Sequence, residues 1–167
     1  ELGPAELFTA VERPDGHGHP PRAIRLHTRN DVGILQKDTP FELSPDTVLR
    51  WRWRVDQLPA RGAEDQVPSH DYMSIAVEFD DGRDITFLWS RSLPVGTVFA
   101  CPLPGWQDRE THVVARSGDA ELGRWVEDAV NLHDIYRRAV GGEPPARVRR
   151  VWLIGVSLFG HGEGRSE

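Results

Sequence analysis

Three arginines at alternate positions form the first group of side chains that could bind a ligand. Arg50, Arg52 and Arg54 alternate with apolar residues, and every second residue of a β-strand points to the same face at a spacing of about 7 Å. Guanidinium groups at that spacing suit the successive carboxylates or phosphates of an acidic saccharide. The alternative is an ordinary solvated face, on which acids of a neighbouring strand pair with the arginines. The acids proposed for that pairing are Glu78, Asp80 and Asp84.

A histidine and a tyrosine two positions apart could carry acid–base chemistry. His70, Asp71 and Tyr72 open a predicted strand, in which Asp71 points away and only His70 and Tyr72 share a face. An imidazole and a phenol can serve as base and acid in an elimination or a hydrolysis, with Arg52 neutralising a substrate carboxylate. The alternative is that the three residues only cap the entrance of the strand.

Two tryptophans lie in polar, glycine-containing segments outside the strand alternation. They are Trp106 and Trp125. Exposed indole rings can stack on sugar rings or hold an apolar ligand, and the alternative is that they close the ends of a hydrophobic core. Both tryptophans are therefore candidate ligand-binding residues.

The sequence shows no pattern typical of a metal or cofactor site. His17 and His19 form a Gly-His-Gly-His run with no cysteine or third histidine nearby, which is weak evidence for a metal site. Cys101 is the sole cysteine, so no intrachain disulfide forms, and its neighbourhood in the sequence offers no base to activate a thiol. We therefore expect no metal ion and no cofactor, and we expect Cys101 to fill space.

These candidate residues must be positioned by β-structure, whose clearest element is the segment 47–56. Leu49, Trp51, Trp53 and Val55 alternate with the arginines and share one face of the predicted strand. An indole buries about 150–250 Å², worth about 25 cal/mol per Å². We therefore expect the indole face to be buried and the arginine face to point outward.

Other strands and one helix complete the expected fold. The segments 72–80 and 84–89 predict a hairpin across Asp81-Gly82, the segment 57–69 predicts a long loop, and 128–140 predicts the helix. Further strands are expected near 7–11, 22–28, 32–35, 94–102, 111–116 and 151–159. This pattern favours an all-β fold, a two-sheet antiparallel jelly-roll sandwich with one α-helix, with a closed β-barrel as the alternative.

Composition restricts the classes of partner. The 167 residues, 38% of them hydrophobic and 28% charged, predict a single domain spanning 1–167 with its own core. A net charge of −6 argues against a general nucleic-acid binder. No stretch is apolar enough for a membrane-spanning helix. The expected partner is a small molecule or saccharide, and the expected state is a monomer or a homodimer formed through an edge strand.

Several motifs together resemble a known family. They are the strand Leu49–Val55, Asp71-Tyr72 with Val77 and Phe79, Trp89, Pro94–Phe99, Gly123–Trp125 and Asn131–Asp134 with Tyr136. Over residues 23–156 the chain is similar to a bacterial family of unknown function, often exported, with predicted sandwich-like domains. The resemblance implies the sandwich fold and a secreted or periplasmic location, but no activity. It ends at Phe159–Glu163, where family members tend to carry an acidic, asparagine-bearing segment.

Two function hypotheses follow. The first is a non-catalytic module that binds a carbohydrate or acidic saccharide through the arginine row and the loop tryptophans. The alternative is a small lyase, hydrolase or cyclase that uses His70 and Tyr72. A structural or dimerising role is a third possibility.

Overall fold

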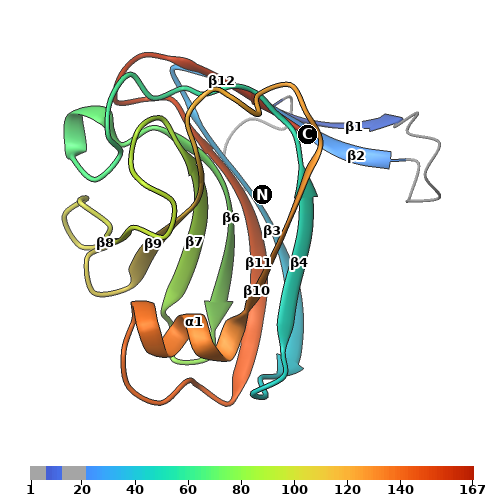
Figure 1. Ribbon diagram of the computed structural model, residues 1–167, viewed down its shortest axis with the longest axis vertical. Helices are drawn as coiled ribbons and strands as arrows, with labels where there is room; N and C mark the ends of the chain where they lie inside the picture. The colour runs from blue at the N-terminus through green and yellow to red at the C-terminus, as the bar shows by residue number, and fades with distance from the viewer. Residues whose placement is uncertain (1–6, 13–21) are drawn as a thin grey trace.

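The computed structural model describes residues 7–12 and 22–167 and consists mostly of β-strands in two layers (Figure 1). One layer is a six-stranded sheet whose order is β3 (Val32–Glu42), β11 (Arg147–Val156), β6 (Tyr72–Phe79), β7 (Asp84–Ser90), β9 (Glu110–Ser117) and β8 (Val98–Ala100). The other layer holds the ribbon of β10 (Val126–Asn131) and β4 (Val48–Trp53), and the sheet β1 (Phe8–Glu12), β2 (Arg22–Arg29), β12 (Glu163–Ser166) and β5 (Val55–Gln57). This confirms the predicted all-β sandwich.

The ribbon and the four-stranded sheet join into one covering layer. Only Arg54 separates β4 from β5, and the backbones of Arg54 and Glu167 exchange two hydrogen bonds of 2.8 Å each. Among the described residues, none of the three sheets closes into a barrel. The sandwich therefore keeps open sides.

One ladder differs from the expected antiparallel pattern. β9 pairs with β7 in parallel, whereas β8 pairs with β9 antiparallel. The chain leaves β7, forms β8 at the sheet edge and then turns back, so β9 enters the gap beside β7 in the same direction as β7. The outer position of β8 thus explains the parallel pair.

The predicted hairpin is present as β6 and β7, joined at Gly82, whose φ of 81° suits a glycine. Its strands lie in the middle of the six-stranded sheet and are buried on both faces. The inner face, toward β4 and α1 (Leu132–Ala139), carries Val77, Phe79 and Phe87. The outer face carries a second apolar cluster that includes Tyr72 and Leu88.

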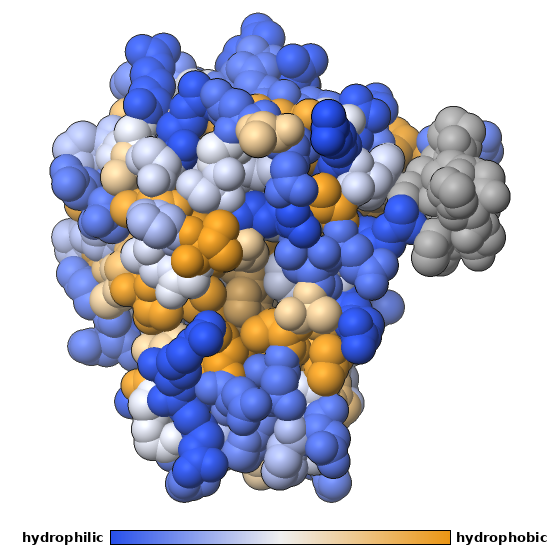
Figure 2. Space-filling model, in the orientation of Figure 1, coloured by the Kyte–Doolittle hydropathy of each residue, from blue (hydrophilic) through white to orange (hydrophobic). Residues whose placement is uncertain are grey.

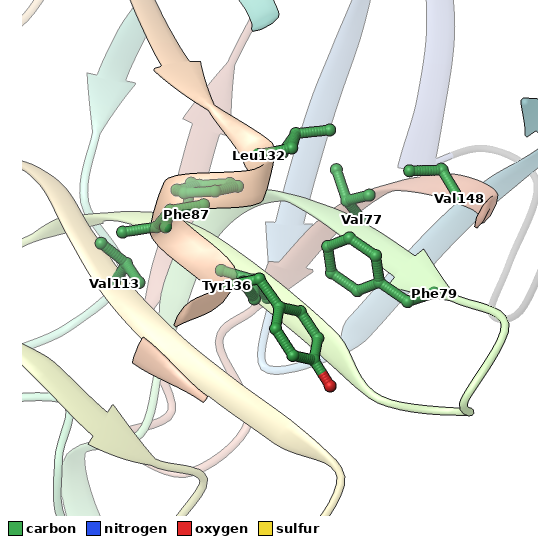
Figure 3. Packing of buried hydrophobic residues seen from close by; sticks show 9 residues of the cluster. Val77, Phe79, Phe87, Val113, Leu132, Tyr136 and Val148 are labelled. Atoms are coloured by element: carbon green, nitrogen blue, oxygen red, sulfur yellow. The ribbon is translucent and has the colours of Figure 1, made fainter. Parts of the chain in front are cut away.

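Helix α1 closes one end of the inner core. In Figure 3, Leu132 and Tyr136 point from the helix toward Val77, Phe79 and Phe87 of the sheet. The rings of Phe79 and Tyr136 meet edge to face at 5.0 Å. No helix among the described residues is long and apolar enough to cross a membrane.

The indole face of β4 packs inward, as the alternation predicts, with Trp53 buried and Trp51 half-buried. Trp51 packs on Phe87 and Trp53 packs on Trp89, each with ring centroids 5.4 Å apart. Arg50, on the opposite face of the strand, is exposed. Arg50 therefore points outward, whereas Arg52 is half-buried.

The predicted helix over 128–140 is wrong at its start. Residues 126–131 form β10, which pairs with β4 along its whole length. Asn131 then ends the strand and caps the helix, because its Oδ1 accepts a 2.9 Å hydrogen bond from the Asp134 backbone N–H. Pairing with β4 thus overrides the helical spacing of the first four residues. The sequence analysis also missed β12.

Candidate functional site

A cavity of about 260 Å³ opens between the two layers of the sandwich. Trp51 and Trp53 of β4 and Trp125, just before β10, form one side of it. Ile75 and Leu153 of the six-stranded sheet lie on its wall opposite β4. We call this cavity the tryptophan pocket.

The pocket lies where the ribbon meets the four-stranded sheet, since β2 and β12 also contribute to its wall. A second cavity, of about 160 Å³, lies between β9, the ribbon and α1, and Trp51, Phe87 and Ile135 line it. Figure 2 shows apolar side chains reaching the surface in a hollow at the middle of the face that carries α1. Trp51 lines both cavities, so the interior of the sandwich is partly hollow on either side of this ring.

The indole of Trp53 is held in place by a polar anchor. Its Nε1 donates a 2.8 Å hydrogen bond to Oδ2 of Asp128 on β10, and the same oxygen accepts a 2.9 Å hydrogen bond from Nε of Arg116. Trp51 meets Trp53 edge to face, with centroids 6.0 Å apart. The indoles of Trp51 and Trp53 are thus oriented by the protein itself, which lowers the entropy lost when a ligand binds.

The arginine row does not act as one stripe. Arg52 is half-buried and lies on the pocket wall, whereas Arg50 is exposed away from it. Nε of Arg54 forms a 2.8 Å ion pair with Asp56. Of the three arginines, only Arg52 therefore reaches the pocket, and the second arginine on its wall is Arg22 of β2.

The predicted pairing of the row with Glu78, Asp80 or Asp84 is wrong. β4 pairs with β10, where Glu127 lies opposite Arg52, while Glu78 lies on β6 in the other layer. There, Glu78 Oε2 is 3.2 Å from Nε of Arg150. The sequence analysis correctly predicted that β4 and β6 are strands, but it assigned β4 the wrong neighbouring strand.

The two loop tryptophans lie in different places. Trp125 is half-buried in the pocket wall. Trp106 is 37% exposed in the turn before β9, with the guanidinium carbon of Arg109 5.3 Å from its ring centroid, and it is not part of the pocket wall. The structure thus brings Trp125 together with Arg52 and leaves Trp106 apart.

His70 and Tyr72 lie on the outer face of the six-stranded sheet. Their rings are 5.0 Å apart, and both are buried. Asp71 points elsewhere and accepts hydrogen bonds from the backbone N–H groups of Phe159 and Gly160, at 2.9 and 2.7 Å. Arg52 belongs to the opposite layer, so the geometry does not bring it to His70 and Tyr72.

Other buried side chains gather around His70. Sγ of Cys101 is 3.6 Å from Nε2 of His70, and the rings of His70 and His112 are 4.9 Å apart. One potential ligand atom from each of His70, Cys101 and His112 lies within 4.8 Å of the others. Oε1 of Glu110 is 3.3 Å from Nε2 of His112. We call these four residues the histidine–cysteine cluster.

The elements of the sheet explain why these residues meet. Glu110 and His112 alternate on the outer face of β9, and Cys101 follows β8, with its backbone N–H bonded to the Glu110 carbonyl at 3.0 Å. His70 ends the loop before β6. The sequence analysis missed this group, since only Glu110 and His112 are neighbours in the sequence. His17 and His19 lie outside the described residues.

Burial sets the protonation of the cluster. It lowers the pKa of His70. It lowers the pKa of His112 well below its usual value, and the nearby His70 lowers that pKa further. Burial also raises the pKa of Cys101 to about 12. Without a bound cation, the imidazoles of His70 and His112 and the thiol of Cys101 are thus neutral. A neutral thiol is a poor nucleophile.

A carboxyl next to the cluster is also perturbed. The pKa of Asp84 is raised to about 8, first by burial and then by the nearby charges of Glu110 and Glu78. Asp84 is therefore largely protonated at neutral pH.

Comparison with known families identifies one match. The family described as "Protein of unknown function (DUF3047)" matches residues 10–167. No curated protein matches the chain. The match extends beyond both ends of the region over which the motifs show the resemblance, and it includes the divergent segment Phe159–Glu163.

Proposed function

The chain belongs to the DUF3047 family of proteins of unknown function, and we propose that it is a non-catalytic module that binds an acidic sugar in the tryptophan pocket. The observation that carries this proposal is the convergence of Trp51, Trp53 and Trp125 on one cavity, with Arg22 and Arg52 on its wall. Indole rings supply apolar faces for the C–H groups of a sugar ring, and guanidinium groups bind carboxylates. The pocket combines both.

The size of the pocket indicates a small ligand. Its volume of about 260 Å³ is just below the range of about 300–1,000 Å³ that holds drug-sized ligands. A single ring fits this space better than a polymer segment does. We therefore propose a uronic acid, free or at the end of an acidic saccharide, as the ligand class.

The position of His70 and Tyr72 favours binding over acid–base catalysis. Both are buried on the outer face of the six-stranded sheet, whereas the pocket lies on the inner face. A ligand held by Arg52 would thus be separated from both residues by the sheet. In the pocket itself, the titratable side chains on the wall are Arg22, Arg52 and Glu167.

The test is calorimetric titration of the protein with glucuronate and with glucose. We expect wild type to bind glucuronate, and we expect Trp125→Ala to weaken binding by at least tenfold, about 1.4 kcal/mol. The matched control is Trp106→Ala, which removes an indole outside the pocket wall and should leave the affinity within about twofold. Equal affinities of wild type and Trp125→Ala, or an effect confined to Trp106→Ala, would overturn the proposal.

A further inference from the structure

We infer that the histidine–cysteine cluster is a structural zinc site, with His70, Cys101 and His112 as ligands and Glu110 as the fourth. This site is separate from the tryptophan pocket, since it lies on the outer face of the six-stranded sheet. Thiolate and imidazole are ligands that zinc prefers. The inference therefore stands whether or not the pocket binds a sugar.

Two of the distances between candidate ligand atoms match those of a tetrahedral zinc centre. Zinc bond lengths of about 2.3 Å to sulfur and 2.0–2.1 Å to nitrogen or oxygen place a sulfur and a nitrogen ligand about 3.6 Å apart, and a nitrogen and an oxygen ligand about 3.4 Å apart. Cys101 Sγ is 3.6 Å from His70 Nε2, and His112 Nε2 is 3.3 Å from Glu110 Oε1. The candidate atoms of His70, Cys101 and His112 lie within 4.8 Å of one another, so these side chains would move inward to complete the set around one ion.

His112 supplies independent evidence for a missing partner. Its side chain is fully buried, and neither ring nitrogen makes a hydrogen bond among the described residues, although Glu110 Oε1 lies 3.3 Å from Nε2. The ring also stacks on Phe99, with centroids 4.9 Å apart and planes 8° apart, so it is fixed in place. Buried polar groups without partners are rare because their desolvation is costly, and a bound cation would satisfy one of these nitrogens.

The residues around the ligands resemble a second coordination shell. Nδ1 of His70 donates a 2.6 Å hydrogen bond to the Glu64 carbonyl, which leaves Nε2 free to face Cys101. Oε1 of Glu110 accepts hydrogen bonds from Thr86 at 3.1 Å and Tyr72 at 3.3 Å. Such partners fix the tautomer and orientation of zinc ligands.

Charge and burial indicate a structural role. Cys101 and the two histidines are 0% exposed and Glu110 is 7% exposed. One thiolate and one carboxylate would balance the two positive charges of zinc, so the buried site would be neutral. A closed set of four protein ligands leaves no position for water or substrate.

The first measurement is the metal content of purified full-length protein, by plasma mass spectrometry, followed by exchange with cobalt(II). We expect one zinc ion per chain, and after exchange a thiolate-to-cobalt charge-transfer band with the strong visible bands of tetrahedral cobalt. Because Cys101 is the sole cysteine, Cys101→Ser must abolish the charge-transfer band. Cobalt binding without that band in wild type, or its persistence in Cys101→Ser, would overturn the inference.

Two controls separate this site from other histidines. His133→Gln alters a histidine of α1, and the double change His17→Gln/His19→Gln removes the Gly-His-Gly-His run. Both proteins should keep zinc, whereas His112→Gln should lose it. If the double variant loses zinc while His112→Gln keeps it, the metal binds elsewhere and the inference is wrong.

A stability measurement covers the case in which a ligand variant does not fold. A strong chelator should lower the melting temperature of wild type by several degrees, because metal binding stabilises only the folded state. The same treatment should lower the melting temperature of the His17→Gln/His19→Gln protein by the same amount. A wild-type protein that contains no metal and does not respond to the chelator would contradict a structural zinc site.

Discussion

The indole of Trp53 is tied to Asp128 by a 2.8 Å hydrogen bond from Nε1 to Oδ2. The two residues lie on neighbouring strands of the ribbon, in which Asp128 is opposite Trp51. This bond makes β10 the support on which the tryptophans of β4 are oriented. The pocket therefore depends on a strand that comes much later in the chain.

Asp128→Ala should destabilise the protein and weaken ligand binding. The change leaves the buried Trp53 N–H without its acceptor and removes a hydrogen bond of Arg116, so we expect a loss of about 2–3 kcal/mol in the free energy of unfolding. Urea denaturation measures this loss. The control, Asp108→Ala at an exposed position, should change stability by less than about 0.5 kcal/mol. Equal stabilities of the two variants would disprove the anchoring role.

Arg52→Gln should reduce the affinity for glucuronate while leaving any binding of glucose unchanged. Arg52 lies on the pocket wall, and losing a charged partner of a carboxylate costs about 1.5–3 kcal/mol, or roughly tenfold or more in affinity. Arg50→Gln is the matched control, because Arg50 belongs to the same strand but points to solvent. If both variants lose affinity equally, the effect is a long-range charge effect and Arg52 does not contact the ligand.

Tyr136→Phe should make stability less sensitive to alkaline pH. Burial and the hydrogen bond to Asp81 raise the pKa of Tyr136 above its ordinary value of 10.0. The stabilisation from this phenol is complete below pH 10 and is lost as the pH rises through the folded-state pKa, since the unfolded chain ionises first. The melting temperature of wild type should therefore fall more steeply above about pH 10 than that of Tyr136→Phe. If the melting temperatures of wild type and Tyr136→Phe fall in parallel with pH, ionisation of Tyr136 does not contribute to the alkaline loss of stability.

Gly162→Ala should destabilise the protein, because the loop before β12 packs against the backbone of Pro59. A Cβ at position 162 would lie 2.4 Å from the carbonyl oxygen of Pro59, so one of the two segments must move, at a cost of about 1–3 kcal/mol. Thermal unfolding measures the loss. At Gly62 the nearest atom to an added Cβ, in Ser69, is 3.7 Å away, and Gly62→Ala should be tolerated. Similar melting temperatures of the two variants would mean that the Pro59 contact is loose.

Local patterns predicted the features that depend on neighbours in the sequence. The alternation of Trp51 and Trp53 with arginines identified the buried face, and Asp81-Gly82 identified the hairpin. The motifs also identified a family of unknown function. These features could be read because strand faces and tight turns are set within a few residues.

Long-range pairing could not be read from local patterns. The sequence does not show that β4 pairs with β10, and the expected partners of the arginine row were therefore wrong. The helical spacing of residues 128–131 is equally compatible with a strand, and only the partner β4 decides between the two. The histidine–cysteine cluster needs the parallel insertion of β9 beside β7, which no local signal indicates.

The most direct test of the tryptophan pocket is the ¹H–¹⁵N correlation spectrum of its indoles during titration with glucuronate. The chain has six tryptophans, and each indole N–H gives its own signal. We expect the signals of Trp51, Trp53 and Trp125 to shift together with one saturation curve, while those of Trp106 and Trp152 stay in place. A shift of Trp106 without Trp125, or no shift of the three pocket indoles at saturating ligand, would contradict the proposed site.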